Sequence, residues 1–171
     1  MDTFLAFTLK SNGILDMLKT DTLINSNIRD KSKNIDASKK WRGLWDTGAS
    51  KSSIDKRVAD ELGLIPVGKG TISTANGVVA VNTYFVNLTL PNHVTVNDVL
   101  VTGADLGTDI DVLIGMDIIR HGDFSITNTN SATTFSFRIP SVAEIFTGRS
   151  SRMYEGKAGN KEKSEIKKSQ G

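Results

Sequence analysis

The chain has 171 residues, 38% hydrophobic and 23% charged, which suits one folded domain and excludes disorder of the whole chain. It has no cysteine, which excludes disulfides, thiolate metal sites and a cysteine nucleophile and fits a reducing compartment. The net charge of +2 is too small to indicate a nucleic-acid partner. No apolar run approaches the ~20 residues that span a bilayer. The start also lacks the basic region of a signal peptide, so we expect a cytoplasmic protein with no membrane partner.

The first forty-five residues are expected to form a hairpin, a loop and a strand. Residues 3–10 and 14–24 have the apolar and β-branched composition of strands, and Ser11-Asn12-Gly13 between them is a turn signal. Part of the second run, residues 14–19, also fits a helical turn. Residues 25–40 are polar and charged, which is typical of a loop. A short strand is expected at 41–45.

A helix is expected next, over residues 55–62. Asp55 or Ser53 would cap its N-terminus, and Val58 and Leu62 have the spacing of inward-facing side chains. Gly63 directly after the helix is a stop signal, because glycine adopts the left-handed conformation common at helix ends.

The following elements are mostly strands. Residues 71–75 and 78–90 are β-rich and are joined by Asn76-Gly77, the strongest short hairpin signal. Further strands are expected at 94–101 and 112–114, a helical turn at 117–120 and a last hairpin at 124–127 and 133–139. The pattern therefore predicts a mainly β domain with one or two short helices.

From Gly148 the composition changes to Gly, Ser, Lys and Glu. Residues 148–171 carry seven basic and three acidic side chains and almost no apolar ones. Such a segment cannot bury enough surface to order itself, so we predict a folded domain over 1–147 and a disordered basic tail over 148–171. A weak contact of this tail with nucleic acid is the alternative to a solvated tail.

The chemistry of the chain is expected at Asp46-Thr47-Gly48, directly after the strand at 41–45. Hydrolysis of an amide by carboxylates needs two of them sharing one proton. One takes a proton from the attacking water, while the other donates to the carbonyl oxygen. By itself the tripeptide also fits an ordinary turn with an Asx hydrogen bond.

Three motifs in order strengthen the chemical interpretation. These are Leu-Trp-Asp-Thr-Gly-Ala-Ser at 44–50, the Asn76-Gly77 hairpin, and Val-Leu-Ile-Gly-Met-Asp-Ile-Ile at 112–119. With them the sequence resembles the retropepsin-like aspartic proteases, the family of the retroviral proteases, and particularly their bacterial and phage-type members. The resemblance covers most of the chain outside the tail. It implies a single-domain closed β-barrel, half of an acid protease, with a flap hairpin.

The resemblance also implies a function and a site. The chain would be an aspartic endopeptidase that acts on peptide or protein substrates as a homodimer, without cofactor or metal. Asp46 would be the catalytic aspartate, Thr47 would tie the two active-site loops together across the dimer, and Gly48 would contact the substrate backbone. The substrate-binding residues carried over are Ala49, Ser50, Thr74, Ala75, Asn76, Gly77, Leu113 and Ile114; for Ile114 a plain core position is the alternative.

The sequence departs from the retroviral pattern at Ser50, Lys51, Met116 and Asp117. The acids that anchor the substrate backbone in many retroviral enzymes and the arginine that braces them are missing. Pocket specificity and dimer bracing therefore do not transfer. A catalytically weak peptide-binding or scaffold module with the same fold is the alternative function.

Other ionisable residues are expected to lie outside the site. Asp105, Asp109 and Asp111 are interpreted as solvent-facing loop residues and not as a metal site, because no His or Glu completes a ligand set. His93 and His121 are expected at the surface.

Overall fold

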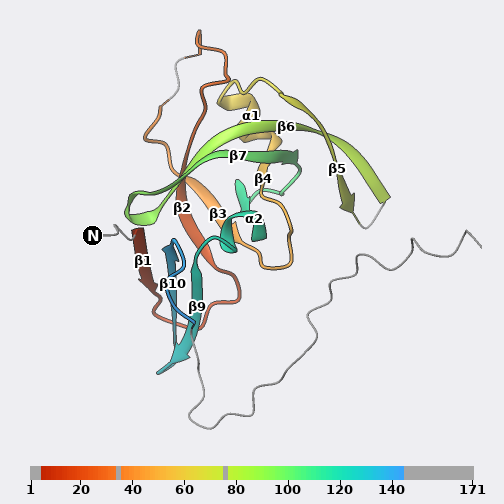
Figure 1. Cartoon of the computed structure of the whole chain (residues 1–171). Coiled ribbons are helices and arrows are strands. Elements are labelled where there is room, and N and C mark those ends of the chain that lie inside the picture. Colours follow the sequence, from red (N-terminus) through yellow and green to blue (C-terminus); the bar gives the residue numbers. More distant parts are fainter. Residues whose placement is uncertain (1–4, 34–35, 75–76, 145–171) are drawn as a thin grey trace, which may run out of the picture.

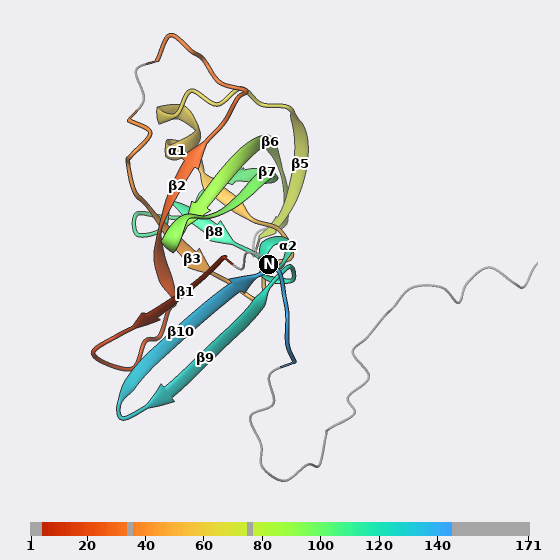
Figure 2. The same cartoon turned by 60° about the vertical axis from the view of Figure 1, so that its left-hand side comes forward.

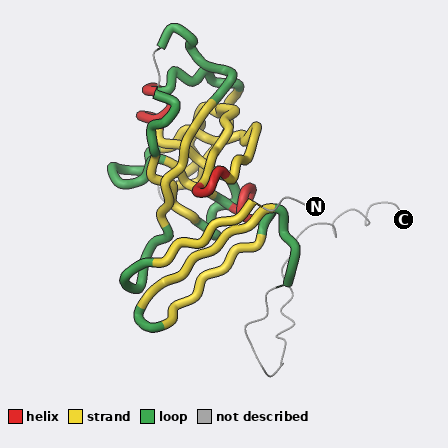
Figure 3. The backbone as a smooth tube through the Cα atoms, turned by 90° about the vertical axis from the view of Figure 1, so that its left-hand side faces the viewer, coloured by secondary structure: helices red, strands yellow, loops and turns green. Residues whose placement is uncertain are grey.

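The computed structural model describes residues 5–33, 36–74 and 77–144, and within these ranges the chain is built mainly of strands (Figures 1 and 3). The elements in chain order are β1 (Leu5–Lys10), β2 (Lys19–Asn25), β3 (Trp41–Trp45), β4 (Ser53–Asp55), α1 (Lys56–Glu61), β5 (Gly68–Thr74), β6 (Gly77–Leu90), the 3-10 helix η1 (Pro91–His93), β7 (Val94–Ala104), β8 (Val112–Ile114), α2 (Met116–Ile119), β9 (Asp123–Thr129) and β10 (Ala132–Ile139). The expected mainly β class with two short α-helices is confirmed. The predicted tail at 148–171 lies outside the described residues. No helix in the described ranges is long and apolar enough to cross a membrane.

The larger sheet has seven strands in the order β2-β3-β8-β4-β7-β6-β5. An additional pairing of β2 with β6 links the two ends of this run, so the sheet curls back on itself as a barrel does. β5 lies beyond the β2–β6 link and pairs only with β6 among the described strands. β3 and β8 run parallel, which places the ends of both strands at one edge of the barrel.

The smaller sheet has the order β1-β10-β9 and corrects the prediction for the N-terminus (Figure 2). The expected hairpin of residues 3–10 with 14–24 is wrong, because β1 pairs with β10 and β2 pairs with β3 and β6. The turn at Ser11 to Gly13 docks on β10 instead: Ser11 N donates to Thr133 O (2.9 Å) and Thr133 N donates to Gly13 O (3.1 Å). Residues 14–18 form neither a strand nor a helix.

An aromatic cluster joins the two sheets. It consists of Phe7, Trp45, Phe124, Phe135 and Phe137, with ring centroids 4.9 Å apart for Trp45–Phe137 and 5.1 Å apart for Trp45–Phe135. Four of the five rings are buried, and Phe124 is half-buried. Burial of large rings is a main source of stability, so this cluster explains why β1 pairs with β10 and not with β2.

The local signals of the first helix are confirmed. Asp55 caps α1 by accepting a hydrogen bond from Arg57 N, and Gly63 adopts a φ of 58° after the helix. Val58 and Leu62 are 0% and 3% exposed, so they face the core as predicted.

The two hairpins are also confirmed. In β5–β6, Thr74 pairs with Gly77, so the loop is Ala75-Asn76, one residue earlier than expected, and these two residues lie outside the described ranges. In β9–β10, Asn130 and Ser131 form the two-residue turn with φ values of 54° and 58°.

Candidate active site

The Asp46 turn begins where two parallel strands end together. Trp45 pairs with Ile114 across β3 and β8, and Asp46 N donates to Ile114 O (3.0 Å). Trp45 is buried, and its indole N–H donates to Thr20 Oγ1 (3.1 Å). The backbone that enters the turn is therefore fixed by both the sheet and the core.

The carboxylate of Asp46 is oriented by its own turn. Its Oδ1 accepts a hydrogen bond from Gly48 N (2.8 Å), and Ala49 N donates to Asp46 O (3.3 Å). A side chain at position 48 would place its Cβ 3.1 Å from Asp46 Oδ1, so glycine suits this close approach. Asp46 is half-buried, while Thr47 and Gly48 are exposed. The group is thus held in one orientation and remains open to solvent and to a ligand.

The loop after the turn is fastened to α2. Met116 N donates to Ala49 O (2.8 Å), which joins the two segments directly. Ser52 donates from its backbone N to Asp117 Oδ2 (2.9 Å) and from its hydroxyl to Asp117 Oδ1 (2.7 Å). The Ser52 hydroxyl, which is fully buried, also accepts from Gly115 N (3.0 Å).

Sequence reasoning missed this Ser52–Asp117 anchor. The sequence places Asp117 in the motif at 112–119, in the helical turn at 117–120 and among the departures from the retroviral pattern, but it predicts no partner for Asp117 and no role for Ser52. The only available signal was an acid in the first turn of the short helix, where a carboxylate is favoured. The structure adds the partner, 65 positions away in the sequence.

The remaining candidate residues fall into two groups. Ala49, Ser50, Leu113 and Ile114 lie beside the turn on the β3–β8 framework; Leu113 is half-buried and Ile114 is fully buried in the core. Thr74 and Gly77 belong to the β5–β6 hairpin, which arches over on the side of the β3–β4 loop (Figure 1). The side chain of Thr74 and all of Ala75 and Asn76 lie outside the described parts of the chain.

Of the three aspartates before β8, Asp105 and Asp109 are exposed as predicted, whereas Asp111 is buried. Asp111 is 6% exposed, so the prediction that it faces solvent is wrong. It accepts hydrogen bonds from Arg42 N (2.8 Å) and Arg42 Nε (3.3 Å), and Asp109 pairs with the same guanidinium (3.4 Å). No group of three or more His, Cys, Asp or Glu that could hold a metal occurs in the described ranges. His93 and His121 are exposed, as expected.

The pKa of Asp55, the residue that caps α1, is lowered by its hydrogen bonds and by a nearby arginine. Burial would raise the pKa of Asp55, but the N–H groups of Leu106 and Arg57 and the Arg57 guanidinium hold that pKa below its usual value. Asp55 therefore stays charged as the cap of α1.

Comparisons with known proteins agree with this geometry. Residues 34–118 match the family model described as aspartyl protease. The fold is similar to the crystal structure of a retropepsin-like aspartic protease from Rickettsia conorii, with a TM-score of 0.53, 16% identity, and coverage of 80% of this chain and 96% of that chain. The solution structure of the simian foamy virus (mac) protease is a weaker match, with a TM-score of 0.41, 15% identity, and coverage of 60% and 92%. No curated protein sequence matches significantly. The aspartyl protease model therefore covers the segment that contains the Asp46 turn, and the fold of the chain is that of the retropepsin-like aspartic proteases.

Proposed function

We propose that the chain is an aspartic endopeptidase whose active site forms between two copies, with Asp46 of each copy supplying one carboxylate. The observation that carries this proposal is the Asp46 carboxylate itself, oriented by Gly48 N at the end of β3 within the segment that matches the aspartyl protease family. The coarser statement, a peptidase, is supported by the aspartyl protease family model over residues 34–118. The dyad, the dimer and the residue roles are our inference.

The need for a second copy follows from the chemistry. The sequence contains Asp-Thr-Gly once, and one carboxylate cannot act as base and acid in the same step. Two carboxylates at close range share one proton, because both cannot ionise together. A two-fold axis beside Asp46 supplies the second carboxylate from an identical turn. The exposed Thr47 of each turn would then join the two loops across the axis.

The proposed reaction uses water alone. The ionised Asp46 takes a proton as the water oxygen bonds to the scissile carbonyl carbon, and the protonated Asp46 of the other copy gives its proton to the carbonyl oxygen. The resulting tetrahedral diol then loses the amine as the C–N bond breaks. One carboxyl gives its proton to the leaving nitrogen, and the other carboxylate takes a proton from a diol hydroxyl. The products are an amine and a carboxylic acid, and the dyad again holds one shared proton.

The substrate would lie between the turn and the β5–β6 hairpin. Gly48, Ala49 and Ser50 would line one side of the peptide, and the tip of the hairpin at Thr74 to Gly77 would close over the other. Of the two apolar residues carried over from the family, Leu113 is half-buried and suits a pocket wall, whereas Ile114 packs in the core. Lids of this kind exclude water and complete the site when substrate binds.

A peptide-library cleavage assay tests the proposal with two matched variants. Asp46→Asn should retain the fold and lose cleavage by roughly 10²–10⁴-fold or more, because an amide cannot exchange the proton. Asp60→Asn is the control, since Asp60 is an exposed carboxylate on α1. Comparable cleavage by wild type and Asp46→Asn would show that the catalytic assignment is wrong. Peptide binding without cleavage by wild type would favour the alternative of a peptide-binding module.

A further inference from the structure

The outer edge of β9 has no strand partner in the described parts of the chain, and only Asp123 at its start is bonded to the segment after β10, through Ser141 and Val142. β9 ends the three-stranded sheet and pairs only with β10 among the described strands (Figure 2). The two-residue turn between Thr129 and Ala132 sets the alternation, so every second residue from Asp123 to Thr129 bonds to β10. The residues between them, Phe124, Ile126 and Asn128, direct their backbone N–H and C=O groups outward. Such a row is a template for another strand.

This edge lacks the usual protection against strand pairing. Residues 124–134 contain no Lys, Arg, Asp, Glu or Pro, the residue types with which natural edge strands avoid association. The other edges differ: β5 carries Lys69, and on β1 the Ala6 carbonyl accepts a hydrogen bond from Asn92 Nδ2 (2.7 Å). The unprotected edge is therefore particular to β9.

Apolar side chains extend the open edge into a patch. Ile126 is 45% exposed and Phe124 is half-buried, although their partners across the strand pair, Phe135 and Phe137, are buried. Leu15 is 46% exposed and lies over the same face, because its backbone N donates to Thr133 Oγ1 (2.9 Å) and it lines a pocket with Phe135. We call Leu15, Phe124, Ile126 and the outer edge of β9 the β9 patch.

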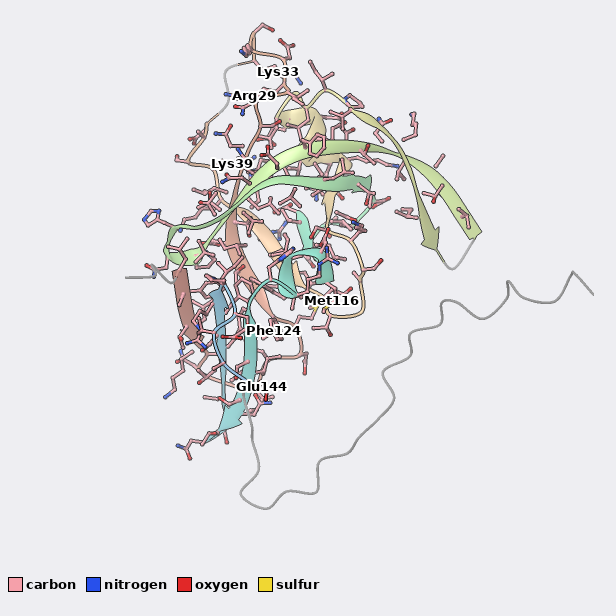
Figure 4. The ribbon with its side chains drawn as sticks, viewed as in Figure 1. Arg29, Lys33, Lys39, Met116, Phe124 and Glu144 are labelled. Carbon is pink, nitrogen blue, oxygen red and sulfur yellow. The ribbon has the colours of Figure 1, made fainter. Side chains whose placement is uncertain are left out.

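The β9 patch adjoins the catalytic turn. Phe124 packs against Trp45, with ring centroids 5.9 Å apart, and Trp45 directly precedes Asp46. Figure 1 shows the outer edge of β9 and the β3–β4 loop facing the same side of the molecule, and Figure 4 shows Met116 of α2 above Phe124 of β9. A partner on the β9 patch would therefore also lie near Asp46.

We infer that a second copy of this chain docks on the β9 patch, with β9 pairing antiparallel to β9 of the partner about a two-fold axis near Ile126. The inference rests on the proposed function, which needs a second Asp46. In a two-fold symmetric dimer the same surface of each copy contacts its counterpart on the other copy, so this surface must be complementary to itself. An uncharged strand edge meets this condition, since antiparallel pairing matches residue 124 with 128 of the partner and no like charges oppose each other. The two small sheets then join into one beneath the active site.

Disulfide trapping tests the contact directly, because the chain has no cysteine of its own. Antiparallel neighbours have Cα atoms about 4.5–5.5 Å apart, within the range that a disulfide bridges. Full-length Ile126→Cys should form a covalent dimer on mild oxidation and keep its cleavage activity. Ile65→Cys, at a position 50% exposed on the loop after α1, is the matched control and should stay uncrosslinked at the same concentration.

A charge variant tests the same contact without a cross-link. Ile126→Lys places two ammonium groups beside the axis, so it should sediment as a monomer and fall to the cleavage level of Asp46→Asn, with unchanged circular dichroism. Ile65→Lys should remain dimeric and active.

A dimeric, active Ile126→Lys overturns the inference and leaves the proposed function standing. A dimer that is trapped at Ile126→Cys but cleaves no peptide supports the β9 contact and overturns the proposed function. A monomeric wild type whose Ile126→Cys variant fails to cross-link also overturns the inference and points to residues 145–171 or another protein as the occupant.

Discussion

Two hairpins flank the Asp46 turn, and they are built in opposite ways. In β5–β6 the apolar side chains near the tip are exposed, Val78 to 71% and Val79 to 46%. In β9–β10 one face carries Phe135 and Phe137, which are 2% and 0% exposed and pack on Trp45. The first hairpin projects away from the core, whereas the second is part of it.

This contrast assigns the two hairpins different tasks around the same turn. A segment with few buried contacts opens locally at low cost, which suits a lid. A segment fixed by an aromatic cluster holds its position, which suits a platform for a partner. Between them, Asp46 is bonded to β8 and the loop that follows it is bonded to α2, so the carboxylate that we propose as catalytic would stay in place while the proposed lid moves.

The largest effect on stability is expected from a substitution in the core of the β9–β10 hairpin. Phe137→Ala removes a fully buried ring from the aromatic cluster and should lower the free energy of unfolding by about 3–5 kcal/mol. Val78→Ala, on the exposed lid, should change it by less than about 0.5 kcal/mol and alter KM instead. Urea unfolding and peptide-cleavage kinetics of both variants measure the contrast. Equal destabilisation by the two substitutions would refute it.

A smaller effect is expected at the Ser52–Asp117 anchor, which holds the loop after Asp46 between the two hairpins. Asp117→Ala leaves the buried N–H and hydroxyl of Ser52 without their acceptor, which costs about 1–3 kcal/mol. We expect kcat to fall more than KM rises, because the loop that follows Asp46 loses its fixed position. Thermal melts and cleavage kinetics provide the measurement. The double variant with Ser52→Ala should cost less than the sum of the single variants, and strict additivity would exclude coupling.

This anchor also shows what the sequence could predict. The cap at Asp55, the stop at Gly63 and the two hairpins rest on signals a few residues long, and the structure confirms them. The Asp46 turn could be found because its motif is contiguous. The pairing of Ser52 with Asp117 could not, since neither residue has a local signal for a partner so far along the chain.

The errors have the same origin. The turn at Ser11 to Gly13 suggests a hairpin of β1 with β2. Instead β1 pairs with β10, because this pairing packs Phe7 against Phe135, with ring centroids 5.5 Å apart. Asp111 does lie in a loop, but the prediction that it faces solvent is wrong, because its two arginine partners come from distant parts of the chain. Caps, turns and contiguous motifs can be predicted from neighbouring residues in the sequence. The pairing of strands and side chains that are far apart in the sequence depends on which surfaces pack together in the folded chain.

Stiffening the lid should have a modest effect. Gly77 has a φ of 116°, a conformation that side-chain-bearing residues rarely adopt, although a Cβ there would meet no atom within 4 Å. Gly77→Ala should therefore cost about 1 kcal/mol through the backbone alone and should change KM and kcat by altering the closing of the hairpin. Gly13→Ala is the control, since its Cβ also meets open space and its φ lies outside that region. A Gly77→Ala enzyme with wild-type kinetics would argue against a lid.

The smallest effect is a pH dependence of stability that arises from Asp123 at the start of β9. Asp123, at the start of β9, accepts hydrogen bonds from the Ser141 hydroxyl, from Val142 N (3.0 Å) and from the Arg138 guanidinium (2.9 Å from Nε). These donors, with the Ser141 hydroxyl first, lower the pKa of Asp123 to about 2. An unfolded aspartate has a pKa of about 3.9, so the charged contacts stabilise the fold above about pH 4, and this contribution is lost as the pH falls toward 2. Asp123→Asn should therefore be less stable than wild type at neutral pH, and the difference should shrink between pH 4 and pH 2. Urea unfolding at several pH values checks this, with Asp60→Asn as the control. A difference that stays constant across the range would show that Asp123 holds the end of β10 by shape and not by charge.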